Sequence, residues 1–214
     1  MPVYTADALI LRTYALGEAD RLVVFLTRDR GKKRGVAKNA RKSLRRFGGG
    51  LEPMTAGRVA YVEKERRELV FLNYVEPKRS PLTARGDALG YVGYFAELID
   101  EWAQEADPSE TLYRLGVSVV EALAAGVPPD PLARYFEYWL LRLQGVYQAD
   151  PSATREARAF LDAARASSPI GLTDVNVAPK TLREIEASHR SLIAMHLEKE
   201  LRSARVLKDM VRGQ

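Results

Sequence analysis

Apolar and polar residues alternate over short distances in the first eighty residues, which is the pattern of β-strands. The predicted strands cover residues 4–14, 22–27, 34–37, 51–63 and 69–75. Gly31 lies in the turn before the third strand, where a positive φ is needed. In the last strand, strict alternation places Phe71 and Val75 on one face and Leu72 and Tyr74 on the other. Five short strands predict a small barrel, for which the OB-fold is the common five-stranded arrangement.

From residue 81 onward, apolar residues recur every three or four positions, which is the period of amphipathic helices. Helices are predicted over about residues 89–102, 107–123, 130–146, 152–166, 179–200 and 203–211. The third helix has the strongest apolar stripe and is expected at the centre of its domain. The fold class is therefore α+β, with an OB-fold barrel at 1–80 and an α-helical domain at 81–214, each with its own core.

Charge divides the chain at the same place. Residues 1–80 hold 18 basic and 9 acidic side chains, whereas residues 81–214 hold 15 and 19. A basic module followed by a mildly acidic one supports two domains and predicts a polyanionic partner for the first.

Composition excludes several functional classes. The chain has no cysteine, so disulfides, thiol catalysis and Cys-ligated zinc are ruled out. No catalytic signature and no phosphate-binding loop occurs. His189 and His196 share a helix face, but two ligands are too few for a stable metal site. We expect no enzyme activity, no cofactor and no metal. The first residues lack the layout of a signal peptide, and no apolar run approaches the ~20 residues of a membrane span, so the cytoplasm is the expected location.

The basic charge is concentrated between residues 28 and 46, where ten Lys or Arg residues face one acid, Asp29. The ten are Arg28, Arg30, Lys32, Lys33, Arg34, Lys38, Arg41, Lys42, Arg45 and Arg46. Such an excess indicates a nucleic-acid contact, with a salt slope near −3.5 if about five phosphates of a single strand are neutralised. The alternative is a solvated basic surface with no ligand. Rings for base stacking are available from Phe47, Tyr61 and Tyr74, although rings in small barrels are more often core.

The sequence also resembles a known family. The likeness in the first domain runs through ALILR at 8–12, GEADRLV at 17–23, FLTRDRGK at 25–32, VAKNAR at 36–41 and FGGGLEP at 47–53. In the second it runs through YFAELI at 94–99, LARYFE at 132–137 and LRSARVL at 201–207. These stretches resemble the bacterial recombination mediator family RecO over nearly the whole chain.

The resemblance implies an OB-fold followed by a helical domain. It also implies binding of single- and double-stranded DNA, annealing of complementary strands, contact with the acidic tail of single-stranded-DNA-binding protein (SSB), and action with RecR to load RecA. The family's basic loop corresponds to Lys38, Arg41, Lys42, Arg45 and Arg46. Many relatives carry a four-cysteine zinc finger after the third helix, whereas residues 145–151 here have none.

The position at which the family has an arginine suggests an SSB-tail site at Arg134, beside Leu132 and Tyr135. The alternative is that Arg134 covers the core or pairs with a nearby acid. For the chain as a whole, there are two alternatives. An RNA-binding or ribosome-associated OB-fold protein would bind RNA in preference to DNA, and a protein-interaction scaffold would bind neither DNA nor RNA through the basic stretch.

Overall fold

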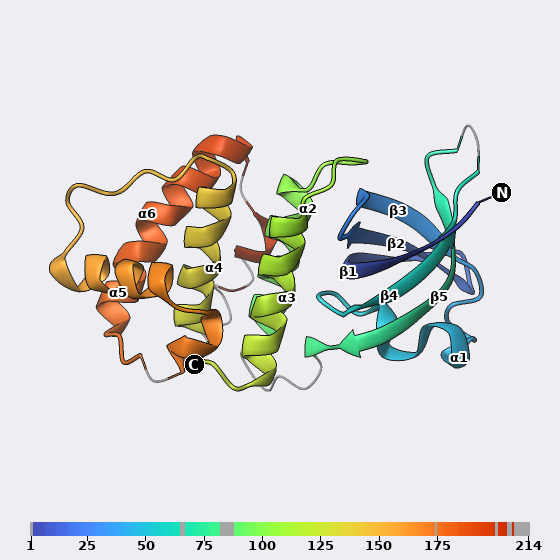
Figure 1. Cartoon of the computed structure of the whole chain (residues 1–214), viewed down its shortest axis with the longest axis horizontal. Helices are drawn as coiled ribbons and strands as arrows, with labels where there is room; N and C mark the ends of the chain where they lie inside the picture. Colours follow the sequence, from blue (N-terminus) through green and yellow to red (C-terminus); the bar gives the residue numbers. More distant parts are fainter. Residues whose placement is uncertain are drawn as a thin grey trace.

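The computed structural model describes residues 2–64, 67–81, 88–173, 175–199, 201–204 and 207. A five-stranded barrel stands beside a group of helices, and α2 and α3 are the helices nearest to the barrel (Figure 1). The predicted fold class, a barrel followed by a helical domain, is confirmed.

The barrel strands are β1 (Val3–Leu16), β2 (Asp20–Thr27), β3 (Gly31–Ala37), β4 (Ala56–Val62) and β5 (Val70–Arg79). They close in the order β1-β2-β3-β5-β4, and the β3–β5 pair is parallel while the others are antiparallel. This is the strand order of an OB-fold. A short helix, α1 (Leu44–Phe47), and a 3₁₀ turn, η1 (Gly48–Leu51), connect β3 to β4.

The predicted alternation of the last strand is wrong beyond Leu72. The β4–β5 register pairs Tyr61 with Leu72 but Ala60 with Tyr74, so Asn73 is an extra residue in β5. Such a bulge reverses the direction of the side chains that follow it. Val75 therefore joins Leu72 in the barrel interior, and Tyr74 faces outward.

The helices are α2 (Ala88–Trp102), α3 (Glu110–Ala124), α4 (Pro129–Leu143), α5 (Arg155–Ala166) and α6 (Pro179–Leu197), with a 3₁₀ turn, η3 (Pro169–Leu172), after α5. As predicted, α4 is central, since it packs against α2, α3, α5 and α6. The second helix begins after Ser109, two residues later than expected. The helix predicted at 203–211 lies mostly outside the described residues. Within the described part of the chain, no helix is both long and apolar enough to cross a bilayer.

The two predicted cores are not independent. Alternate residues of β1 point to opposite sides: Ala8 and Ile10 fill the barrel interior, whereas Leu9 and Leu11 join the core of the helices. Gly116 of α3 lies so close to this outer face that a Cβ there would be 2.5 Å from Cδ2 of Leu9. The larger core is thus shared between the helices and one side of the barrel, which explains why β1 reads as a continuous apolar run.

Candidate nucleic-acid interface

The structure divides the basic stretch into two groups, one in the β2–β3 turn and the first half of β3 and one beyond the end of β3. The hairpin cations are Arg28, Arg30, Lys32, Lys33 and Arg34, around the turn between β2 and β3. The arm cations are Lys38, Arg41, Lys42, Arg45 and Arg46, in the segment that leaves β3 and forms α1. At ~3.3 Å per residue, the length of β3 places the turn residues Arg28 and Arg30 roughly 20 Å or more from the arm, whereas Arg34, in the middle of β3, is nearer to it.

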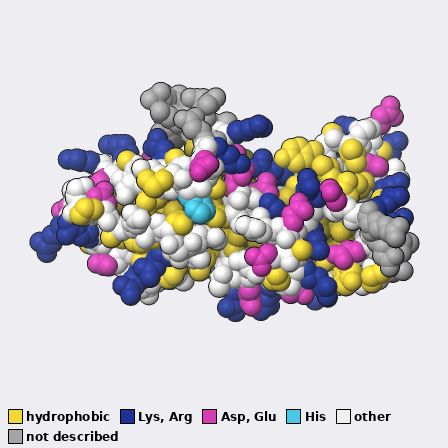
Figure 2. Space-filling model, turned by 90° about the horizontal axis from the view of Figure 1, so that it is seen from above, with side chains coloured by type: hydrophobic (Ala, Val, Ile, Leu, Met, Phe, Trp, Pro, Cys, Tyr) yellow, Lys and Arg dark blue, Asp and Glu magenta, His cyan; other side chains and the backbone are white. Residues whose placement is uncertain are grey.

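Each hairpin cation is ion-paired with a carboxylate of the chain. The pairs are Arg28–Glu110 at 2.6 Å, Arg30–Asp29 at 3.7 Å, Lys32–Asp100 at 3.1 Å, Lys33–Glu63 at 2.9 Å and Arg34–Glu105 at 3.0 Å. Three of these partners, Asp100, Glu105 and Glu110, come from α2, α3 and their connection. Figure 2 accordingly shows acidic side chains interspersed among the basic ones over the barrel part of the face it presents. Arg28, Lys32 and Arg34 therefore link the barrel to the helices, whereas Arg30 and Lys33 pair within the barrel domain.

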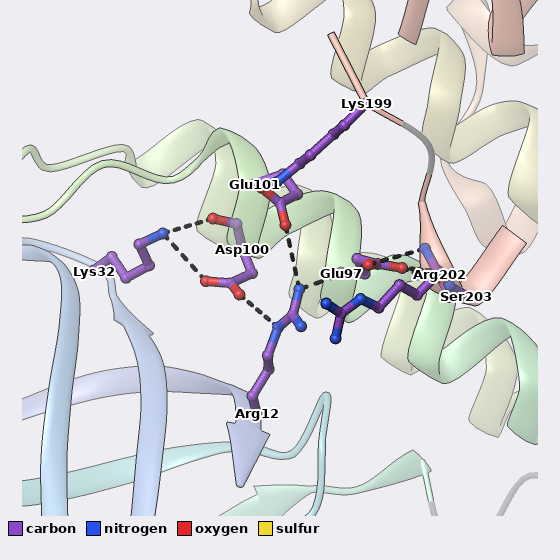
Figure 3. A network of polar contacts seen from close by, with 8 residues as sticks. All are labelled: Arg12, Lys32, Glu97, Asp100, Glu101, Lys199, Arg202 and Ser203. Carbon is purple, nitrogen blue, oxygen red and sulfur yellow. Dashed lines mark hydrogen bonds and ion pairs between the residues drawn. The ribbon is translucent and has the colours of Figure 1, made fainter. Parts of the chain in front are cut away.

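Lys32 belongs to a larger network at this junction (Figure 3). Its Nζ donates to the backbone oxygen of Asp100 at 2.6 Å as well as to the carboxylate. The other Asp100 oxygen pairs with Arg12 of β1 at 2.5 Å, and Arg12 also reaches Glu101 at 3.4 Å. Two barrel strands are thus tied to one turn of α2.

The same network reaches the chain beyond α6. Lys199 pairs with Glu101, and the carboxylate of Glu97 accepts hydrogen bonds from the backbone N–H groups of Arg202 at 3.2 Å and Ser203 at 2.7 Å (Figure 3). Burial opposes the charge of Glu97, but the bonds from Ser203 and Arg202 outweigh it and lower its pKa. Glu97 is therefore a structural anchor for the segment that follows α6.

The arm cations differ from the hairpin cations in a single respect that matters for ligand binding. None of the five forms an ion pair with a carboxylate in the described part of the chain. Lys38, Arg41, Lys42 and Arg45 are exposed. Arg46 is half-buried, and its guanidinium donates to Ser43 Oγ at 3.0 Å and to the Lys38 carbonyl at 2.5 Å. We call the arm uncompensated in the sense that no carboxylate of the described residues lies within ion-pairing distance of its cations.

The arm is nevertheless held in a defined shape. Asn39 takes a positive φ of 55°, which asparagine tolerates, and its N–H donates to Asp20 Oδ1 at 2.8 Å. The N–H of Arg41 donates to the Ala19 carbonyl at 3.1 Å, so the arm rests on the turn between β1 and β2. At its other end, Phe47 is inserted into the barrel core. The arm lies at the end of the barrel away from the helices, where Figure 1 shows α1.

An apolar row crosses the outer face of the barrel beside the arm. Tyr14, Leu22, Val36 and Phe71 are paired in register from β1 through β2 and β3 to β5. Residues paired directly across strands point to the same side, and their neighbours Val23 and Leu72 fill the interior, so this row faces outward. The ammonium of Lys64 lies 4.9 Å from the centroid of the Phe71 ring. Outer faces of this kind bind oligonucleotides in OB-folds.

The rings singled out from the sequence are mostly unavailable. Phe47 and Tyr61 are fully buried in the barrel core, and burial raises the pKa of Tyr61 to about 12. Tyr74 remains partly exposed on β5. Tyr14, which is 46% exposed, and the half-buried Phe71 are further rings on the outer face of the barrel. Their position on the outer face follows from the strand register and not from the sequence pattern.

Arg134 does not form the open cation that the tail site requires. It is 4% exposed, and its guanidinium pairs with Glu137 at 3.0 Å and with Glu186 at 3.5 Å. Leu132 and Tyr135 are buried with it. The alternative considered from the sequence, an arginine paired with a nearby acid, describes this geometry.

Glu137 is the centre of that buried network. It also accepts hydrogen bonds from Tyr94 Oη at 2.6 Å and from the His189 ring, whose Nδ1 lies 3.1 Å away. Burial alone would raise its pKa, but Arg134 and the His189 bond outweigh burial, so the pKa of Glu137 is lowered. This cluster ties α2, α4 and α6 together.

A cavity of about 470 Å³ adjoins this cluster between α4, α5 and α6, and His189 is one of its lining residues. Arg142, Arg158 and Arg165 line it, and Leu161 and Ile185 contribute apolar wall. Its acidic lining residues include Asp150 and Glu184, which accept hydrogen bonds from Ser152 and Thr154. None of the three arginines pairs with a carboxylate of the described residues. Among the residues that the structure covers, no group of three or more His, Asp or Glu could hold a metal ion.

Comparison with family models gives two matches. Residues 1–81 match the model described as "Recombination protein O N terminal", and residues 84–158 match "Recombination protein O C terminal". The two matched segments together take in the barrel, the arm and the helices from α2 to the first turn of α5.

Curated relatives give the same result. The chain is 44% identical to "DNA repair protein RecO" of Koribacter versatilis over 145 residues, which cover 65% of the chain and 58% of the relative. For the protein of that name from Anaeromyxobacter sp. strain K the identity is 39% over 140 residues, covering 64% and 55%. The Geobacter sulfurreducens protein is 36% identical over 168 residues, covering 77% and 68%. The chain thus spans little more than half the length of the first two relatives.

Proposed function

The chain belongs to the RecO family, and from this membership and the uncompensated arm we propose that it binds single- and double-stranded DNA and anneals complementary strands during DNA repair. It acts without catalysis, cofactor or metal, in the cytoplasm at the nucleoid. Annealing is opposed by repulsion between two phosphate backbones. A protein that neutralises phosphates on both strands lowers this barrier.

The observation that supports the proposal is the contrast between the arm cations and the hairpin cations. Five Lys or Arg side chains that face a polyanion bind it without first giving up a carboxylate partner, whereas a paired cation gains less. The apolar row beside the arm adds an OB-fold face on which bases stack. Because phosphates are the main contact, binding is salt-dependent and nearly independent of sequence.

The test is the triple variant Lys38→Glu/Arg41→Glu/Arg45→Glu. Removal of three of five contacts reduces the salt slope for single-stranded DNA from about −3.5 to about −1.4 and weakens binding about a hundredfold at 0.1 M salt. Annealing of complementary strands, followed by fluorescence, is abolished. The thermal midpoint hardly moves, because none of the three side chains pairs with a carboxylate of the described residues.

The matched control is Arg155→Glu/Lys180→Glu/Arg183→Glu, the same charge change at exposed positions of α5 and α6. It keeps the slope and the annealing rate. Equal losses of DNA affinity in both variants would mean that the net charge of the chain, and not the position of the arm cations, determines binding. Unaltered DNA affinity in the arm variant would leave the scaffold interpretation standing, and much tighter binding of RNA than of DNA would favour the RNA-binding alternative.

We propose in addition that the chain contacts the tail of SSB and acts with RecR to promote RecA loading, as the family resemblance implies. The cavity between α4, α5 and α6 fits an acidic tail with an apolar end better than buried Arg134 does. Its arginines offer charge and Leu161 and Ile185 offer an apolar wall. The DNA arm and the tail cavity would then lie at opposite ends of the molecule (Figure 1).

Two measurements test these partners. Fluorescence polarisation with an SSB tail peptide should show weaker binding by Arg158→Ala/Arg165→Ala, while the control Arg183→Ala keeps its affinity. Equal binding by both would exclude the cavity. Annealing of strands already coated with SSB tests the mediator role itself, since a simple DNA-binding protein does not anneal coated strands.

A further inference from the structure

Leu44 is the most exposed large apolar side chain in the described part of the chain, with 80% of its surface open to solvent. It is the first residue of α1, in the middle of the arm, with Lys42 and Arg45 on either side of it in the sequence. An isolated exposed leucine is ordinary on protein surfaces. Leu44 differs because its neighbours are cations without carboxylate partners.

The backbone that carries Leu44 is held by hydrogen bonds. The N–H groups of Arg46 and Phe47 both donate to the Ser43 carbonyl, at 3.2 and 3.1 Å. Phe47 is only 1% exposed and anchors the end of α1 in the barrel core. Leu44 is thus presented on a fixed support, pointing away from the interior that Phe47 occupies.

A rigidly held apolar tip among cations matches one kind of partner, a polyanion with apolar surface between its charges. Nucleic acid has this chemistry, because phosphates line the outside and base faces become accessible wherever the stack ends or opens. Apolar side chains, leucine among them, are used as wedges that enter between base steps and unstack them.

We propose that Leu44 is such a wedge. With the arm cations on the phosphates at a junction of single- and double-stranded DNA, its side chain enters the base stack and opens the last base pair. The inference rests on the proposed DNA binding and adds the residue that acts on the bases. It makes the arm a device that disturbs pairing locally as well as screening charge.

The test uses a duplex with a single-stranded tail and 2-aminopurine in the last base pair, a base whose fluorescence rises when it is unstacked. The wild-type chain raises this fluorescence severalfold on binding. Leu44→Ser abolishes most of the rise but keeps the DNA affinity within about threefold, since a neutral side chain neutralises no phosphate. Leu44→Met restores the rise, because methionine also serves as a wedge.

The matched control is Met195→Ser, which removes a comparably exposed apolar side chain from α6 and leaves the fluorescence rise intact. An undiminished rise in Leu44→Ser with normal DNA binding would overturn the wedge alone. Failure of the wild-type chain to bind DNA would overturn the proposed function and the wedge together. Leu44-dependent binding to phosphatidylglycerol vesicles, without any change in 2-aminopurine fluorescence, would assign the tip to a membrane surface and equally reject the wedge.

Discussion

The two ends of β3 carry the same residue types in opposite states. At the hairpin end, all five cations have a carboxylate partner, and three of the partners belong to the helical domain. At the arm end, none of the five has one in the described part of the chain. A sequence count of ten basic residues therefore combines five that are paired, three of them with the helical domain, with five that have no carboxylate partner in the described part of the chain.

On the proposed function, the binding surface is marked by cations without carboxylate partners rather than by charge density. A cation that already contacts a carboxylate must exchange one partner for another, so the gain on meeting a phosphate is small. When an exposed cation without a partner neutralises a phosphate, the full free energy of counterion release from the DNA favours binding. Stability and DNA affinity should thus depend on separate members of one basic stretch.

The largest loss of folding stability is expected at Arg134, which is the most deeply buried of the paired cations. Arg134→Ala leaves the carboxylate of Glu137 without its main charge partner, and loss of one member of a buried pair costs about 3–5 kcal/mol. At 2–4 °C per kcal/mol for a chain of this size, the thermal midpoint falls by about 6–20 °C. DNA affinity at 25 °C, measured on the folded fraction, is unchanged.

Arg190→Ala is the control for this variant, because Arg190 also pairs with Glu186 but is exposed. Exposed pairs contribute about 0–1 kcal/mol, so its midpoint stays within a few degrees. A similarly small change in the midpoint of Arg134→Ala would mean that the cluster around Glu137 reorganises easily. The claim that paired cations stabilise the fold would then be wrong for this pair.

The next test compares two lysines, Lys32 from the hairpin cations and Lys42 from the arm cations. Lys32→Ala removes two charge-assisted hydrogen bonds to Asp100, worth roughly 1.5–3 kcal/mol of unfolding free energy, and leaves the salt slope of DNA binding as it was. Lys42→Ala changes stability by less than about 0.5 kcal/mol and reduces the slope by about 0.7. Denaturant titration and DNA titration at two salt concentrations measure both quantities. Equal salt slopes of DNA binding for the two variants would show that Lys32 of the hairpin also contacts DNA.

Much of the fold was predictable because local patterns determine it. The strand-length apolar runs and the central stripe of α4 follow from periodicity, and the basic stretch is plain in the sequence. The division of that stretch was not predictable, because Asp100 lies 68 residues beyond Lys32 and Glu110 lies 82 beyond Arg28. Pairing over such distances depends on the packing of the helices against the barrel, which no local pattern specifies.

Three features of the structure differ in how far the sequence signals them. The burial of Arg134 had a local signal, since Glu137 stands three residues later on the same helix, the spacing at which opposite charges pair. The pairing of Tyr14 and Phe71 in one outward row had none, because it depends on the register of four strands and on the direction of each side chain. The bulge at Asn73 likewise arises from the closing of the barrel, where β5 must follow both β3 and β4.

The smallest effect is expected from converting a paired cation into a free one. Glu110→Gln removes the carboxylate that pairs with Arg28 and raises its pKa through a direct hydrogen bond and charge attraction. The pair is exposed, so folding stability stays within measurement error. DNA on the arm lies roughly 20 Å away along β3, which is beyond the Debye length of ~8 Å at 0.15 M salt but within the ~30 Å reached at 0.01 M.

The DNA affinity of Glu110→Gln should therefore equal that of the wild-type chain at 0.15 M salt and exceed it by about twofold at 0.01 M. Glu156→Gln, an exposed change of the same kind on α5, serves as the control and shows a smaller gain at low salt. A clear increase at 0.15 M would place bound DNA directly over the hairpin. The freed Arg28 would then act as a sixth phosphate contact, and the boundary between the two halves of the basic stretch would be set by Glu110 rather than by the geometry of β3.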